Sequence, residues 1–112
     1  MTGISTHILD TVSGAPAAGV EVKLETQNND IWEAVGQGIT DADGRISALA
    51  STVSNLKKGV YRLTFMTGDY YQRISLPCFY PEVVVMFEVS DDRHHHVPLL
   101  LSSYGYSTYR GS

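Results

Sequence analysis

The chain has 112 residues, of which 43% are hydrophobic and 18% are charged, and its formal net charge is −4. This length suits one core, so a single domain over residues 1–112 is expected. Twelve acidic residues face eight basic ones with no long run of either sign. This balance argues against non-specific nucleic-acid binding, which needs a basic surface.

A two-residue hydrophobic period dominates the chain and predicts β-strands. The first candidates are ISTHIL near the N-terminus and VEVKLET, in which Val20, Val22 and Leu24 alternate with charged residues. Later candidates are IWEAVGQGI from Ile31, VYRLTFM around Tyr61, VVVMFEV from Val83, HHHVPLLL from His94 and YGYSTY at the end. SGAPAAG, QNND, DADG and KKG are typical of turns, and GDYYQRI is the one stretch that predicts a short helix. Seven or eight short strands at this spacing predict an all-β sandwich.

Cysteine content and hydropathy bear on the cellular compartment. Cys78 is the single cysteine and has no partner within the chain for a disulfide, so nothing requires an oxidising compartment. A partly buried structural thiol is the preferred interpretation of Cys78, ahead of a catalytic one. No segment approaches the roughly 18 apolar residues of a membrane span, and the N-terminus lacks the features of a signal peptide. A cytoplasmic protein that does not enter the membrane is expected.

Three of the four histidines are consecutive, at positions 94–96. In an extended strand His94 and His96 point to one face and His95 to the other. Two imidazoles on one face could begin a metal site, but zinc needs three or four ligands, and no further ligand has recognisable spacing. An exposed polar patch is the alternative. Because the following strand is apolar, a histidine at its edge is also suited to general acid–base chemistry.

Two further polar residues have both a structural and a functional interpretation. His7 lies within ISTHILD and is either a histidine at the edge of the core, bonded to a backbone carbonyl, or part of a site. Arg45 follows the turn DADG and is either an exposed residue leading a strand or a clamp for a carbonyl or imide oxygen. The residues alone leave both questions open.

Several segments together resemble 5-hydroxyisourate hydrolase, the transthyretin-related enzyme of urate breakdown. The resemblance rests on GISTHILDTVSGAPAAGVEVKL, DADGR, FYPEVVVMFEV and HHHVPLLLSSYGYSTYRGS, and it extends from Gly3 to Ser112. The final YRGS is the most specific part, because it separates the hydrolases from transthyretin, the hormone carrier of the same fold. His95 departs from the pattern, since the family usually has tyrosine there.

The resemblance implies a set of site residues. His7, Arg45, His96 and Ser112 would be catalytic, and Tyr109 would join His7, Arg45 and Ser112 in binding the substrate and would help to close the site. We assign His7 as the general base, oriented by Ser112, with His96 positioning the substrate or protonating the leaving nitrogen. No metal ligand is implied. A further expectation is that residues added after Ser112 impair activity more than residues added at the N-terminus.

The resemblance also implies the fold, the reaction and the assembly. The fold would be a transthyretin-like (prealbumin-like) β-sandwich of about eight strands with one short helix. The reaction would be cofactor-free hydrolysis of 5-hydroxyisourate to 2-oxo-4-hydroxy-4-carboxy-5-ureidoimidazoline, in a homotetramer whose sites lie between subunits. Two alternatives stay open. One is a small-ligand carrier that uses the channel without turnover, and the other is a structural or metal-binding sandwich.

Overall fold

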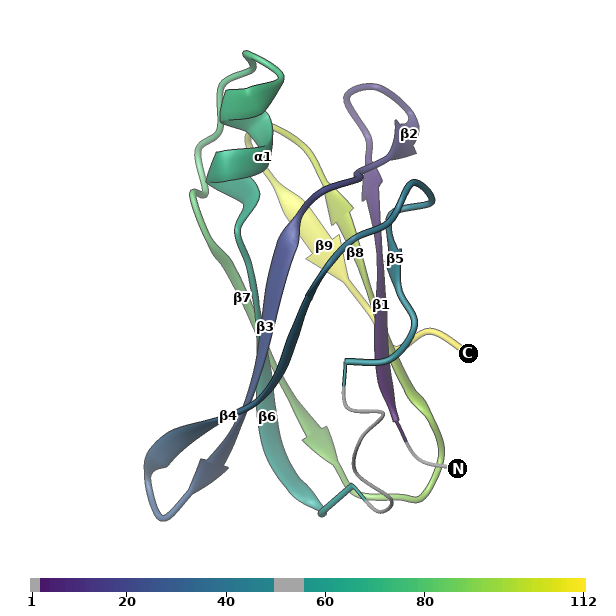
Figure 1. Ribbon diagram of the computed structural model, residues 1–112, viewed down its shortest axis with the longest axis vertical. Helices are drawn as coiled ribbons and strands as arrows, with labels where there is room; N and C mark the ends of the chain where they lie inside the picture. Colours follow the sequence, from purple (N-terminus) through teal and green to yellow (C-terminus); the bar gives the residue numbers. More distant parts are fainter. Residues whose placement is uncertain (1–2, 50–55) are drawn as a thin grey trace.

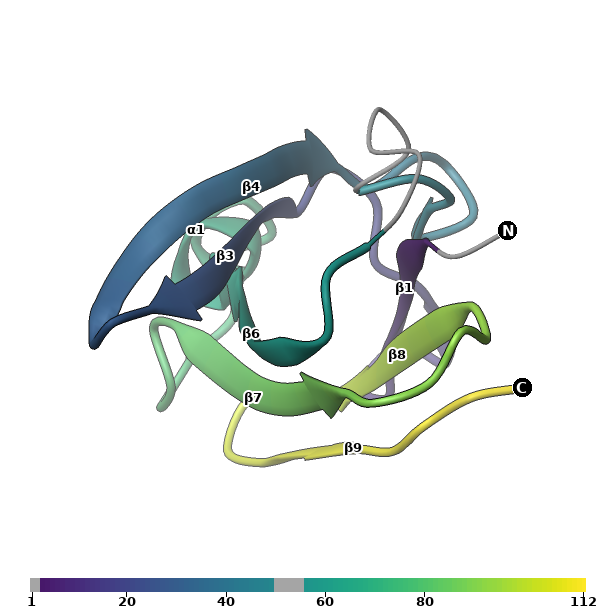
Figure 2. The same cartoon turned by 90° about the horizontal axis from the view of Figure 1, so that it is seen from below.

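The computed structural model describes residues 3–49 and 56–112, which form two facing β-sheets with a short helix at one end (Figures 1 and 2). One sheet contains β1 (Ile4–Asp10), β2 (Ala15–Pro16), β5 (Arg45–Ile46), β8 (His95–Leu101) and β9 (Tyr106–Thr108). The other contains β3 (Glu21–Asn28), β4 (Ile31–Ile39), β6 (Gly59–Phe65) and β7 (Val83–Val89). Helix α1 (Thr67–Arg73) follows β6. The predicted all-β sandwich with one short helix is confirmed.

The strands agree with the sequence pattern except at the shortest ones. Each of the seven predicted strands is present, and α1 overlaps the predicted GDYYQRI. The two-residue strands β2 and β5 were not predicted, and β2 lies inside SGAPAAG, which had been interpreted as a turn. Two residues are too few to show a hydrophobic period, so pairing with β1 alone defines both strands.

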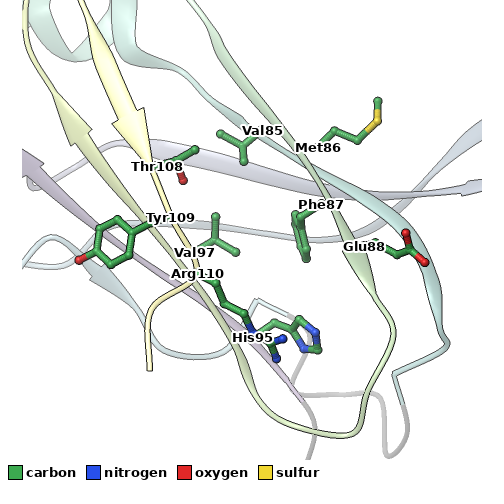
Figure 3. A pocket seen from close by; sticks show the side chains of 9 residues that line it. All are labelled: Val85, Met86, Phe87, Glu88, His95, Val97, Thr108, Tyr109 and Arg110. Atoms are coloured by element: carbon green, nitrogen blue, oxygen red, sulfur yellow. The ribbon is translucent and has the colours of Figure 1, made fainter.

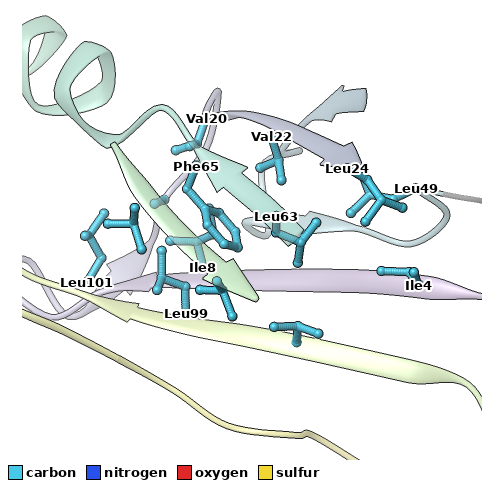
Figure 4. Close-up of a cluster of buried hydrophobic side chains, with 14 of the residues drawn as sticks. Ile4, Ile8, Val20, Val22, Leu24, Leu49, Leu63, Phe65, Leu99 and Leu101 are labelled. Atoms are coloured by element: carbon cyan, nitrogen blue, oxygen red, sulfur yellow. The ribbon is translucent and has the colours of Figure 1, made fainter. Parts of the chain in front are cut away.

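The core lies between the two sheets, where the alternating apolar residues of the strands meet (Figure 4). Val22 and Leu24 of β3 point into it, as do Leu63 and Phe65 of β6, and all four side chains are fully buried. Each side chain of this size contributes about 1.5–3 kcal/mol when it leaves water. From β8 the core takes Val97, Leu99 and Leu101. Within the described part of the chain, no helix is long and apolar enough to cross a membrane.

The pairing of β1 with β8 joins two segments from opposite ends of the sequence. These strands run parallel, with Ser5 opposite His96 and His7 opposite Pro98. Because facing residues of a parallel pair point to the same side, Ser5, His7 and His96 share the outer face of this sheet. Ile4 and Ile8 occupy the alternate positions of β1 and are buried in the core.

Helix α1 is attached to β1 through a buried carboxylate. Asp10 is fully buried and accepts hydrogen bonds from the Tyr70 hydroxyl (2.8 Å), the Tyr71 hydroxyl (3.0 Å) and the Val12 amide (2.9 Å). Burial, followed by the hydrogen bond to Asp10, raises the pKa of Tyr70 to about 12. The same causes raise the pKa of Tyr71 above its ordinary value. Both phenols therefore stay protonated and act as donors at neutral pH.

Replacing Tyr71 with phenylalanine is expected to lower the free energy of unfolding by about 1–3 kcal/mol, because a buried carboxylate loses one of its donors. Equilibrium urea unfolding measures this difference. Tyr104→Phe removes the same hydroxyl from a side chain that is 68% exposed, and it should leave the stability nearly unchanged. Equal stability of the two variants would contradict the structural role of the Asp10 cluster.

Candidate active site

A polar pocket of about 300 Å³ opens on the outer face of the sheet, where β1, β5 and β8 meet. We call it the Arg45 pocket, and its lining residues are Ser5, Thr6, Arg45, Ile46, Ser47, His94, His96 and Ser112. The pocket combines residues from the start, the middle and the end of the sequence. Three of the four residues predicted to be catalytic, Arg45, His96 and Ser112, lie in it.

A tight turn places Arg45 at the pocket. The Asp41 carboxylate accepts hydrogen bonds from the amides of Asp43 (2.9 Å) and Arg45 (3.0 Å). Gly44 has a φ of +73°, and a Cβ there would lie 2.6 Å from the Ile8 carbonyl oxygen, so only glycine fits. The Gly44 carbonyl then accepts from the Ile8 amide at 2.8 Å. This anchoring sets Arg45 directly opposite His7 in the β1–β5 register.

His96 is half-buried and held by one of its two ring nitrogens. Its Nδ1 lies 2.8 Å from the Ser5 hydroxyl, so Nε2 is the nitrogen left for a ligand. Burial lowers the pKa of His96, and the charges of Arg45, His7 and His94 lower it further. His96 is therefore neutral at physiological pH and is able to accept a proton.

Ser5 links His96 to a second histidine. The same hydroxyl lies 2.7 Å from His94 Nε2, so it bridges the two imidazoles. Ser5 is 7% exposed, whereas His94 is exposed to solvent. The sequence-based prediction that His94 and His96 share one face is confirmed, and His95 lies buried on the other.

His7 lies next to the pocket without lining it. Its Cα pairs with those of Arg45 and Pro98, and its ring is half-buried. The hydrogen bonds between described residues include none to the His7 ring, so the backbone-bonded interpretation has no support there. Its charge contributes to the lowered pKa of His96, which places the two histidines within electrostatic reach of each other.

Two contacts fix the segment that carries Ser112. The Gly111 amide donates to the His96 carbonyl at 2.8 Å. Arg110 donates from both Nη atoms to the Asp91 carboxylate, at 3.0 and 3.1 Å, and so forms a bidentate pair. The Arg110 guanidinium holds the pKa of Asp91 well below its usual range. Asp91 lies in the loop between β7 and β8. The C-terminal segment is therefore held at two points, by Arg110 on this loop and by Gly111 on His96 in β8.

Replacing Gly111 with alanine is expected to displace the His96 ring. For the hydrolysis that the resemblance implies, kcat should fall by roughly 10–100-fold, because moving a catalytic group by about 1 Å slows a reaction by that much. A Cβ at this position would lie 2.5 Å from His96 Cδ2 and 3.2 Å from Pro98 Cγ, and the Ser5 bond prevents the ring from moving freely. Steady-state kinetics measures the loss.

The matched control is Gly105→Ala, whose new Cβ would meet only the Ser102 hydroxyl at an ordinary 3.7 Å. Its kcat should stay within about twofold of the wild-type value. A Gly111→Ala protein as active as this control would show that the close contact with His96 does not matter for turnover.

Tyr109, the remaining predicted site residue, lies outside the Arg45 pocket. It is 57% exposed and lines a second cavity of about 180 Å³ between β7 and the last strands (Figure 3). His95 and Arg110 line that cavity as well. His95 is buried, neither ring nitrogen has a hydrogen-bond partner among the described residues, and its Nε2 lies 3.8 Å from Asp91 Oδ1. Burial is the main reason that the pKa of His95 is lowered.

The described residues do not bring together the side chains that a metal site needs. Within residues 3–49 and 56–112, no group of three or more histidine, cysteine, aspartate or glutamate side chains could hold a metal ion. What the Arg45 pocket does offer is a guanidinium, a neutral imidazole and a hydroxyl around one space. A guanidinium stabilises an oxyanion and a neutral imidazole accepts a proton, so the pocket suits hydrolysis of a carbonyl compound.

Sequence reasoning missed Ser5 and Asp91. Asp91 belongs to no motif, whereas Ser5 lies in the GISTHILD segment on which the resemblance rests, where no role was assigned to it. The alternation of β1 puts Ser5 on the same face as His7, and this was the available signal. Its contact with His96 depends on the parallel pairing of β1 with β8, which no period reveals.

Comparison with known proteins gives consistent matches over the whole chain. The model of the HIUase/Transthyretin family matches residues 4–111. The 5-hydroxyisourate hydrolase of Salmonella typhimurium is 50% identical over 110 residues, which cover 97% of this chain and 80% of that protein. The 5-hydroxyisourate hydrolase of Caulobacter vibrioides is 47% identical over an alignment of 117 residues that covers 100% of both.

Solved structures include both an enzyme and a carrier. The 5-hydroxyisourate hydrolase of Klebsiella pneumoniae has a TM-score of 0.88 and 37% identity, covering 100% of both chains. Sea bream transthyretin in complex with thyroxine has a TM-score of 0.89 and 32% identity, covering 97% of this chain and 94% of that one. Since the two TM-scores are nearly equal, the backbone alone does not separate the two activities.

Proposed function

Because the chain belongs to the HIUase/Transthyretin family, we propose that the Arg45 pocket is the site at which it hydrolyses 5-hydroxyisourate. The relatives named 5-hydroxyisourate hydrolase support this activity, a hydrolase step of urate degradation. The proposed product is 2-oxo-4-hydroxy-4-carboxy-5-ureidoimidazoline. One observation carries the assignment to this pocket. Arg45, His96 and Ser112 come from distant parts of the sequence and line the same space.

The pocket residues divide the reaction between them. A water molecule attacks a ring carbonyl carbon, and the new C–O bond places negative charge on the carbonyl oxygen. Arg45 stabilises that oxyanion, as its fixed fork of donors suits it to do. His96 Nε2 takes the proton from the water and passes it to the leaving nitrogen when the lactam C–N bond breaks. Ser112 positions the water or the substrate.

This division moves the role of general base, which the sequence-based hypothesis gave to His7, to His96, and His96 keeps its predicted part in protonating the leaving nitrogen. His7 was assigned as the base, but it does not line the pocket, whereas His96 does and has its Nδ1 anchored. We therefore propose His96 as the base. His7 lies opposite Arg45 in the β1–β5 register, beside the pocket.

The pH dependence of kcat/KM follows from the environment of His96. A base acts in its neutral form, and burial together with nearby positive groups lowers the pKa of His96 below its ordinary value near 6.5. Activity should therefore persist below pH 6.5 and fall only as the pH drops through this lowered pKa. A pH–rate profile from initial velocities measures the acid limb. A limb centred above 6.5 in the wild-type protein would contradict His96 as the base.

The assembly that we propose is a homotetramer in the cytoplasm, with each site completed by a second copy. The edge strands β7 and β9 carry exposed apolar side chains, namely Val84, Met86 and Tyr106, beside the exposed Tyr109. A monomer in water would leave this surface uncovered. Tyr109 lies outside its own chain's pocket, so its proposed part in closing the site depends on this assembly. Light scattering after size-exclusion chromatography measures the oligomeric state.

A carrier without turnover is the second candidate, since sea bream transthyretin in complex with thyroxine superposes as well as the enzyme does. The decisive experiment follows the ultraviolet decay of 5-hydroxyisourate generated in place from urate by urate oxidase, with a chelator present. Decay much faster than the spontaneous rate supports the enzyme. Decay at the spontaneous rate, with retention of thyroxine in equilibrium dialysis, would establish the carrier instead.

A further inference from the structure

The Ser5 hydroxyl joins a half-buried histidine of the proposed site to an exposed one. Its oxygen lies 2.8 Å from His96 Nδ1 and 2.7 Å from His94 Nε2. A hydroxyl has one proton to donate and lone pairs to accept with. In a fully hydrogen-bonded arrangement of two neutral imidazoles, Ser5 accepts from one ring and donates to the other. Two arrangements satisfy this requirement, and they differ in which nitrogen of each ring holds its proton and in which ring accepts the Ser5 hydroxyl proton.

The surroundings of the two rings differ in how well they tolerate a positive charge. His96 is half-buried and faces Arg45 on β5, His7 on β1 and His94 beside it, and each of these disfavours an imidazolium. His94 is exposed to solvent. A proton taken up at His96 is therefore better tolerated if the charge appears on His94.

We propose that Ser5 is a positioning residue that relays protons between His96 and His94 during hydrolysis. This inference rests on the proposed function of the pocket. In the starting arrangement His96 Nδ1–H donates to Ser5, the Ser5 hydroxyl donates to His94 Nε2, and His96 Nε2 is the free base. His94 then carries its own proton on Nδ1.

Over one turnover, every proton that leaves a group of the relay is replaced. When His96 Nε2 takes the proton of the attacking water, its Nδ1 proton moves to Ser5 Oγ and the original Ser5 proton moves to His94 Nε2. His96 is again neutral, with its proton on Nε2, and His94 is the imidazolium. When the C–N bond breaks, His96 Nε2–H protonates the leaving nitrogen and both transfers reverse. The starting arrangement is restored with no net proton gained or lost by the protein.

The relay predicts a split between kcat and KM. Ser5→Ala should lower kcat by about tenfold or more, less than the roughly 10²–10⁴ expected for the base itself, because His96 survives without its partner. Its KM should stay within about twofold, since the Ser5 hydroxyl contacts the two imidazoles and the relay affects proton transfer rather than substrate binding. Ser5→Thr keeps the hydroxyl and should recover most of kcat. Ser90→Ala makes the same change at an exposed serine in the loop after β7 and should behave as wild type.

A spectroscopic test does not require turnover. In the full-length protein with ¹⁵N-labelled histidine, long-range ¹H–¹⁵N spectra report the protonation of each ring nitrogen. Titration of His94 should shift the His96 Nδ1 signal in the wild-type protein, and this response should vanish in Ser5→Ala and return in Ser5→Thr.

The outcomes separate the relay from the activity on which it rests. If the His96 Nδ1 signal of the wild-type protein does not change while His94 titrates, the relay is overturned. This holds even if the protein turns over 5-hydroxyisourate. Wild-type kcat in Ser5→Ala also overturns it. Failure of the wild-type protein to accelerate the decay refutes the proposed function, while coupled titration would still establish the hydrogen-bonded chain.

Discussion

Replacing His96 with asparagine is expected to lower kcat for 5-hydroxyisourate by roughly 10²–10⁴-fold, the usual contribution of a general base. Asparagine keeps a polar side chain that can contact Ser5, so the fold around Gly111 should persist, but it accepts no proton at neutral pH. His96 lines the pocket, keeps Nε2 free and has a lowered pKa, and together these properties suit it to the role. Initial rates of ultraviolet decay measure the loss.

His7→Asn is the matched comparison, since it makes the same change one strand away. Its kcat should also fall, because His7 adjoins Arg45, but the acid limb of its pH–rate profile should persist. That limb belongs to His96 in our assignment. Loss of the acid limb in His7→Asn, together with near-normal turnover of His96→Asn, would return the role of base to His7.

Replacing Arg45 with glutamine is expected to lower kcat by about 10²–10³-fold, which is typical when one preorganised oxyanion donor is lost. Arg45→Lys keeps the positive charge without the fork of donors, so it should recover only part of the rate. Removing the charge should also move the acid limb toward higher pH, because Arg45 is among the groups that lower the pKa of His96. Steady-state kinetics between pH 5 and 8 measures both effects.

Arg62→Gln controls for the loss of one positive charge elsewhere on the surface. Arg62 lies on β6 in the other sheet, where it pairs with Glu25 at 2.8 Å and covers the Trp32 ring at 4.2 Å. This variant should keep kcat within about twofold of wild type. Equal losses in the two arginine variants would mean that the overall charge, rather than the position of Arg45, controls the rate.

The strands were predictable where burial on one face imposes alternation. Val22 and Leu24 on β3, and Leu63 and Phe65 on β6, repeat every second residue because one face of each strand is in the core. β2 and β5 were not predictable, since two-residue strands carry no period. Their positions follow from hydrogen bonds to β1, which become visible only in three dimensions.

The residues of the site were largely predictable from the sequence, but the contacts between them were not. Family resemblance identified Arg45, His96 and Ser112, and the structure brings them into one pocket. Ser5 was missed although it lies in the GISTHILD segment, because its contacts with His94 and His96 depend on the pairing of strands distant in the sequence. Tyr109, just after β9, lines the cavity against β7 rather than the Arg45 pocket, so its part in closing the site stays a prediction.

The parallel pairing of β1 with β8 has a consequence for how the protein folds. Ser5 and His96 are 91 positions apart, so their contact closes a loop that includes most of the chain. Such loops form slowly, since their closure entropy must be overcome before the contacts contribute, and proteins rich in them fold over milliseconds to seconds. During synthesis β1 leaves the ribosome long before β8 exists. During synthesis the proposed site can therefore form only after β8 has emerged, and no N-terminal fragment that ends before β8 should show activity.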